Sequence, residues 1–209
     1  MNKKEAVSKF IKLLDQEYPD AKCSLVTSNP LELLISTLLS AQCKDDRVNM
    51  VTGPLYAKYR SAEDFANADV EDIEHYIRSL GLYKNKAKNI VKCCQKIVSL
   101  YHGQVPQTME ELLTLDGIGR KTANLVLGDA FGIPGIVVDT HAIRLSNRMG
   151  LTKNKDPYKI EMDLKKIVPP EHQTRFCHML VLHGRKYCTA RKPDCEHCPL
   201  AEYCPKIIA

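Results

Sequence analysis

Apolar residues recur along the chain at the spacing of amphipathic helices. Between Lys86 and Tyr101 apolar side chains fall three or four positions apart, which places one continuous stripe against a core. The same spacing begins at Val7 near the N-terminus and again at Ile160. The one β-like run, Ile136–Val138, is short and has no second strand to pair with. The pattern therefore predicts an all-α fold of about ten short helices.

Turn-forming residues mark where these helices begin and end. Asn29-Pro30 is expected to open a helix that continues through Leu39, because proline is tolerated in a first helical turn. The best candidate for a domain boundary is Phe131–Gly135, where a strong helical pattern stops and a new element begins. The predicted breaks are Thr52-Gly53-Pro54, Gly81, Gly103–Gln107, Gly132–Gly135 and Pro169-Pro170.

The composition of the 209-residue chain is that of an ordinary globular protein. Hydrophobic residues make up 44% and charged residues 26%, which excludes a disordered or collagen-like chain. No apolar run approaches the roughly 18 residues that a membrane helix needs, so we expect a cytoplasmic chain without a membrane partner. The formal net charge of +5 permits a polyanionic partner but does not require one.

The nine cysteines are unevenly distributed. An odd number in a chain expected to stay in the cytoplasm argues against a disulfide framework. Four of them form the spacing Cys188-x6-Cys195-x2-Cys198-x5-Cys204 on a short polar segment, which cannot bury them all, so we interpret them as metal ligands. The other five lie in apolar surroundings and are interpreted as small buried hydrophobic side chains: Cys23, Cys43, Cys93, Cys94 and Cys177.

Four thiolates suit either zinc or a [4Fe-4S] cluster. Zinc modules mostly pair two short Cys knuckles, whereas this segment has a single Cys-x2-Cys with two outlying ligands, which favours the cluster. The ligand count alone leaves zinc open. Either centre would hold Arg191 and Lys192 of the intervening loop where a phosphate can meet them.

A glycine turn, Gly117-Ile118-Gly119, leads directly into a helical pattern. Its glycines permit close backbone approach, and the N-terminus of the following helix presents unpaired N–H groups that can hold a phosphate. With a short helix predicted at Met109–Leu113, the unit is a helix, a hairpin and a helix that would grip one DNA backbone without reading its sequence. A plain turn whose glycines only close the chain is the alternative.

Two charged residues stand at predicted helix starts. Asp139 precedes a helical segment and is expected to be its N-cap, where the helix dipole stabilises a carboxylate that can in turn stabilise positive charge in a reaction. Lys121 lies in the first turn after the hairpin, at the end of the dipole that disfavours a cation. That position favours a nucleophilic amine.

In this order, the motifs resemble the endonuclease III family of the helix-hairpin-helix superfamily, whose members are bifunctional DNA glycosylases and AP lyases. The resemblance runs along nearly the whole chain. It rests on Leu38–Gln42 followed by Asp45, on Gly81-Leu82-Tyr83, on the hairpin ending in Lys121, on Val138–His141, on Leu182–Arg185 and on the cysteine spacing.

The resemblance implies a two-lobed fold. One lobe would be a six-helix domain with the helix-hairpin-helix motif, residues 23–132, and the other a cluster-bearing helical domain made of residues 1–22 and 133–209. DNA would lie in the cleft between them. The resemblance also implies that the four cysteines hold a [4Fe-4S] cluster rather than zinc, with a structural and DNA-positioning role.

Individual roles follow from the resemblance position by position. Lys121 matches the nucleophile and Asp139 the catalytic carboxylate. Gln42 and Leu82 match the residues that enter the duplex where the damaged nucleotide is flipped out. Asp116 stands where the family commonly has proline, which brings a negative charge to the predicted phosphate site. Further DNA contacts are expected from Gly117, Gly119, Arg120, His141, Arg191 and Lys192.

The implied function is removal of oxidised or otherwise damaged pyrimidines from double-stranded DNA, with strand cleavage at abasic sites through a lysine Schiff base. We expect a monomer in the cytoplasm of a bacterium or archaeon, associated with the nucleoid. A mismatch adenine glycosylase of the same superfamily lacks the hairpin lysine that this chain has at Lys121. In other classes, a non-catalytic DNA-binding module would release no free base, and an iron-sulfur electron carrier would leave the hairpin unexplained.

Overall fold

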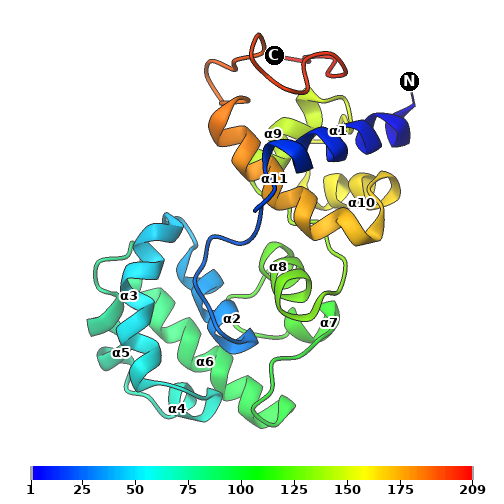
Figure 1. The fold of residues 1–209 in the computed structure, drawn as a ribbon. Helices are drawn as coiled ribbons and strands as arrows, with labels where there is room; N and C mark the ends of the chain where they lie inside the picture. The colour runs from blue at the N-terminus through cyan, green and yellow to red at the C-terminus, as the bar shows by residue number, and fades with distance from the viewer. Residues whose placement is uncertain (1, 209) are drawn as a thin grey trace. The chain divides into compact units, whose positions relative to one another are not determined.

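The computed structural model of the protein describes residues 2–208, which form an all-α structure (Figure 1). The predicted fold class is confirmed, since these residues contain α-helices, one short 3-10 helix and no strand. The β-like run Ile136–Val138 is buried outside any regular element. Its Val137 N–H donates to Cys177 Sγ at 3.2 Å, so a side chain takes the place of a neighbouring strand.

The chain divides into two compact units, Ser24–Gly132 and a second unit that joins Met1–Cys23 to Ile133–Ala209. The first unit contains seven helices, one more than the six expected. One helix that the sequence pattern did not predict is Ala62–Ala66, a single turn that begins at the cap Ser61, because periodicity cannot be read over so few residues. The equally short helix Met109–Leu112, capped by Thr108, lies where a helix before the hairpin was predicted. The helices are α2 (Pro30–Leu39), α3 (Asp45–Lys58), α4 (Ala62–Ala66), α5 (Val70–Ile77), α6 (Tyr83–Tyr101), α7 (Met109–Leu112) and α8 (Arg120–Phe131).

Helix α6 forms the centre of the first unit. It packs against α2, α4 and α5, while α8 packs against α2 and α7. Ile90, Val91 and Cys94 on the predicted stripe of α6 are buried. The hairpin between α7 and α8 and the turn after α2 are therefore held by one shared core.

Helix α3 continues through the break predicted at Thr52-Gly53-Pro54, so that prediction was wrong. Pro54 lies inside the helix, where proline removes a hydrogen bond at a cost of about 3 kcal/mol. Val48, Thr52 and Leu55 are buried, and α3 packs against α2 and α5. The burial of this face offsets the cost of Pro54. Turn-forming residues alone do not reveal that burial.

The second unit holds the N-terminal helix against the C-terminal part of the chain. Arg175 makes this connection: its guanidinium donates to Asp15 Oδ1 at 2.7 Å and to the Tyr18 and Pro19 carbonyls at 3.1 and 2.8 Å. No helix within residues 2–208 combines the length and the hydropathy needed to cross a membrane. The elements of the second unit are α1 (Lys3–Glu17), α9 (Thr140–Arg148), α10 (Pro157–Ile167), the 3-10 helix η1 (Pro170–His172) and α11 (Gln173–Lys186).

Candidate functional site

The predicted hairpin joins α7 to α8 in the first unit. Gly117 has a φ of +79°, and a Cβ atom there would come within 2.9 Å of Leu38 Cδ2, so both the backbone conformation and the available space require glycine. Ile118 is buried and anchors the turn. Gly119 is the N-cap of α8, supplies no side-chain cap, and has open space where a Cβ would lie. The N-terminus of α8 is therefore accessible to an anion.

Asp116 does not bring an unpaired negative charge to this hairpin. Lys96 Nζ on α6 lies 2.9 Å from Asp116 Oδ2 and also donates to the Thr114 carbonyl at 2.7 Å. Both side chains are partly exposed, so the ion pair contributes little to stability, about 1 kcal/mol or less. The ion pair matters mainly for the charge of the hairpin, because the Lys96 ammonium compensates the Asp116 carboxylate at the position where the family commonly has proline.

Lys121 is the second residue of α8, and its side chain is exposed. Arg120, the first residue, is half-buried. The amine of Lys121 is thus attached to a rigid element, immediately after the hairpin, with its side chain open to solvent.

Gln42 and Leu82 share a backbone conformation that is rare outside glycine. Their φ angles are +56° and +59°, in the left-handed region that costs other residues about 1–2 kcal/mol each. Gln42 lies in the turn after α2 and is exposed, and Leu82 is the N-cap of α6 and is 55% exposed as a residue. Only two other non-glycine residues within 2–208 have positive φ. Strain of this kind is concentrated at functional sites.

In the second unit, Asp139 is the N-cap of α9, as predicted. Its Oδ1 accepts the Ala142 N–H at 2.7 Å, and the side chain is half-buried. His141 lies on the first turn of the same helix, with its Nδ1 3.1 Å from an Arg144 guanidinium nitrogen. Gly184 of α11 faces this contact, since a Cβ there would be 2.5 Å from His141 Nδ1. The start of α9 is thus held against α11.

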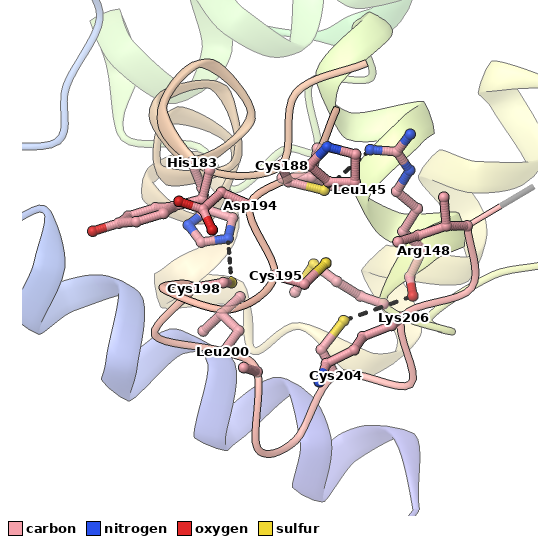
Figure 2. Close-up of a pocket in the computed structure, with 15 residues that line it drawn as sticks. Leu145, Arg148, His183, Cys188, Asp194, Cys195, Cys198, Leu200, Cys204 and Lys206 are labelled. Atoms are coloured by element: carbon pink, nitrogen blue, oxygen red, sulfur yellow. Dashed lines mark hydrogen bonds between the residues drawn. The ribbon is translucent and has the colours of Figure 1, made fainter. Parts of the chain in front are cut away.

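The four C-terminal cysteines line one cavity of the second unit (Figure 2). No group of three or more Cys, His, Asp and Glu side chains within residues 2–208 is arranged to hold a single metal ion. Burial raises the pKa of the Cys198 thiol to about 11, and burial also raises the pKa of Cys204. Four thiolates in one half-buried cavity need a compensating positive charge. This set of donors fits a multi-iron centre, whose irons supply that charge.

Arg148 of α9 holds the loop that follows Cys188. Its guanidinium donates to the Thr189 and Ala190 carbonyls at 2.7 and 2.9 Å and lies 3.5 Å from Cys188 Sγ. Its carbonyl lies 3.8 Å from Cys204 Sγ (Figure 2). One residue of α9 therefore contacts both ends of the cysteine loop.

His183 of α11 connects this loop to the N-terminal segment. Its Nε2 lies 3.3 Å from Cys198 Sγ, and its Nδ1 lies 3.2 Å from Tyr18 Oη. Burial lowers the pKa of His183 to about 4, so the ring is neutral at pH 7 and carries one N–H. With Cys198 as a thiolate acceptor, the N–H lies on Nε2 and the Tyr18 hydroxyl donates to Nδ1. The sequence marked His183 only as part of a motif and did not identify Arg148 or Tyr18, because their roles depend on contacts between distant segments.

Arg191 and Lys192 are both exposed in the loop between Cys188 and Cys195. The Thr189 hydroxyl donates to the Lys192 carbonyl at 2.6 Å, which closes this part of the loop into a tight turn. The two cations thus project from a backbone held by hydrogen bonds.

Comparison with known proteins identifies the class. Residues 35–170 match the HhH-GPD superfamily of base excision DNA repair proteins, and residues 188–204 match the iron-sulfur binding domain of endonuclease III. Endonuclease III of Synechocystis sp. is 50% identical over 209 residues, which cover 100% of this chain and 95% of the relative. Endonuclease III of Bacillus subtilis is 46% identical over 90% of this chain and 86% of the relative.

A solved structure of an endonuclease III has the same fold as this chain. A trapped covalent intermediate of endonuclease III with DNA superposes with a TM-score of 0.91 at 43% identity, covering 99% of this chain and 97% of that one. The all-α fold and the hairpin thus define a helix-hairpin-helix base excision repair protein, and it carries a [4Fe-4S] cluster. The chain belongs to the endonuclease III family and is a DNA glycosylase with AP lyase activity.

Replacing Cys198 with Ser is expected to remove the cluster. The wild-type protein should contain about four irons per chain and absorb broadly in the visible, whereas the variant should contain almost none and lose the folded loop, which has little core of its own. Iron analysis and visible absorption measure the result. Cys23→Ser, outside the loop, is the matched control and should keep its iron. Stoichiometric zinc without iron in wild-type protein isolated without oxygen would contradict the assignment.

Proposed function

We propose that this protein removes oxidised pyrimidines from duplex DNA through covalent attack by Lys121 and then cleaves the strand by β-elimination. The observation that carries the proposal is the exposed Lys121 amine on the second residue of α8, directly after a hairpin open to phosphate. A helix-hairpin-helix grip places the amine beside the backbone of one strand without dependence on sequence. The trapped covalent intermediate of the related endonuclease III supports a covalent route.

The proposed reaction proceeds in four steps. The damaged nucleotide leaves the stack, Lys121 Nζ forms a bond to C1′ of the deoxyribose, and the base departs with the electron pair of the glycosidic bond. Opening of the sugar ring leaves a Schiff base between Lys121 and C1′. Loss of a C2′ proton then expels the 3′ phosphate by β-elimination. Asp139 either stabilises the positive charge that develops on the sugar or removes a proton from the amine.

The remaining residues bind and position DNA in this proposal. Leu82 supplies an apolar wedge, and Gln42 supplies a donor and an acceptor for the unpaired base opposite the lesion. Their exposure and left-handed backbone support these roles. Phosphate contacts come from the hairpin residues Gly117, Gly119 and Arg120, from His141 at the start of α9, and from Arg191 and Lys192 in the cysteine loop.

The two compact units correspond in this proposal to two functional domains. The unit Ser24–Gly132 carries the hairpin, and the other unit carries Asp139 and the cluster loop. Cys188, Cys195, Cys198 and Cys204 are the proposed ligands. When bound, the cluster supplies a rigid charged scaffold for the loop. We further propose that the protein acts as a monomer on damaged duplex DNA or abasic sites in the cytoplasm, associated with the nucleoid.

A panel of duplexes, each with one lesion, tests this function under borohydride. Adducts are expected with oxidised pyrimidines and with abasic sites but not with undamaged DNA, because only the first two lead to a Schiff base. Free base should also be released from the lesions. Binding without adduct or free base on any duplex would instead indicate a non-catalytic DNA-binding module.

Gly119→Val tests the phosphate grip of the hairpin. Open space surrounds the added side chain, so the fold should be kept, but the valine occupies the position that a phosphate would approach. Binding to undamaged duplexes should weaken by about tenfold or more, alike for all sequences, and the dependence on salt should become shallower. Gly119→Ala changes the cap similarly with less bulk and should show a smaller loss. Unchanged affinity and salt dependence in the valine variant would contradict the proposed grip.

A further inference from the structure

Lys86, the fourth residue of α6, is a buried cation with little to pair with. It is only 5% exposed, and Nζ donates to Cys43 Sγ at 3.2 Å. Within residues 2–208 this is the one hydrogen bond or ion pair that Nζ forms. Burial of an ammonium group is costly unless it is well paired. A buried lysine whose ammonium has one weak sulfur acceptor is not explained by packing alone.

The contact lies between the two strained segments described above. Cys43 directly follows Gln42 and is anchored by its own N–H, which donates to the Ser40 carbonyl at 3.0 Å. On the other side, the Lys86 N–H donates to the Leu82 carbonyl at 3.0 Å. A continuous path of covalent and hydrogen bonds thus runs from Gln42 through Cys43 and Lys86 to Leu82.

We propose that Cys43 and Lys86 form a positioning pair that sets the spacing of Gln42 and Leu82 for nucleotide flipping. The inference rests on the insertion roles proposed for these two residues. Both side chains must enter one gap in the duplex together, and groups held in advance at the right spacing lose little further freedom when they do so. Left-handed backbone at non-glycine residues persists only where surrounding contacts enforce it, and this contact connects both positions.

Three variants test the pair. Cys43→Ala removes the acceptor, Lys86→Met keeps the length of the side chain without the N–H donors, and the third variant combines both changes. Each single change is expected to slow single-turnover base release from a duplex with oxidised thymine by about tenfold, the size of effect expected for a hydrogen bond to a charged group. The double variant should also be about tenfold slower, and not about a hundredfold, because both changes remove the same contact. Cys43→Ser retains an acceptor and should keep most of the rate.

A second substrate separates positioning from general damage to the fold. Borohydride trapping at an abasic site that faces a one-nucleotide gap needs no base pair to be broken and has no unpaired base for Gln42 to contact. The variants should trap this substrate at the wild-type rate and unfold at close to the wild-type temperature. A 2-aminopurine opposite the lesion should report slower flipping in the same variants. Equal slowing on both substrates, or additive effects in the double variant, would overturn the positioning pair.

Leu82→Ala and Gln42→Ala test the insertion roles separately from the positioning pair. Both should suppress the 2-aminopurine signal. If they leave the signal unchanged, the insertion roles fail and the positioning pair fails with them. If they suppress it while Cys43→Ala and Lys86→Met do not, the insertion roles stand and the positioning pair alone is wrong.

Discussion

Borohydride is expected to trap no covalent complex between the Lys121→Gln protein and DNA. Glutamine keeps an exposed polar side chain at the second position of α8 but has no amine to form an imine with C1′. Adduct formation and strand cleavage should fall by at least about 10³-fold, as expected when a covalent nucleophile is removed. Denaturing gels of borohydride reactions on oxidised thymine and on abasic duplexes measure both.

The control for this variant is Lys92→Gln, an exposed lysine of α6 in the same unit. It makes the same change in net charge and should trap normally. The Lys121→Gln protein should still bind the lesion, because the hairpin glycines are intact. An undiminished adduct from the Lys121→Gln protein would place the nucleophile at another residue and refute the proposed mechanism.

The second large effect is expected at Asp139, where structural and catalytic roles coincide on one carboxylate. Asp139→Asn keeps an oxygen for the Ala142 N–H, so the cap and the fold should survive. It removes the negative charge that the reaction is proposed to use. Base release should slow by about 10²–10³-fold, the range for loss of one charge-stabilising group. Single-turnover kinetics measures the rate, and thermal unfolding checks the fold.

Asp156→Asn is a closely matched control. Asp156 caps α10 in the same unit, and its Oδ1 accepts the Lys159 N–H at 2.9 Å, so the same chemical change is made at the same kind of helix position. Its base release should remain at the wild-type rate. If both variants slow equally, the effect belongs to helix capping, and if Asp139→Asn keeps full activity, the carboxylate has no catalytic role.

Short sequence patterns predicted the structure correctly where the stabilising interactions lie within a few neighbouring residues. The apolar stripe on α6 predicted its buried face, and Asn29-Pro30 predicted the start of α2. Asp139 was predicted as a cap, and the structure confirms that hydrogen bond. In each case the controlling interaction lies within one helix or its first turn, so neighbouring residues contain the information.

Local pattern failed where packing outweighs propensity. Pro54 signals a break, but α3 continues because its buried face packs on α2 and α5. The charge of Asp116 was expected to stand near the hairpin, but Lys96 of α6 compensates it. Neither outcome is visible in a short window of sequence, since the partner comes from a different helix.

The sequence by itself determined the fold class, the family and the residue types with suitable chemistry: the lysine after a glycine hairpin, the capping carboxylate and the four cysteines. Tertiary structure alone decided how these residues are held. It placed Gln42 and Leu82 in left-handed backbone, joined their segments through Lys86 and Cys43, and brought His183 and Tyr18 to the cysteine loop. The reason is physical, because helix propensity and capping act over a few neighbouring residues, whereas strain and buried polar contacts are maintained by groups far apart in the chain.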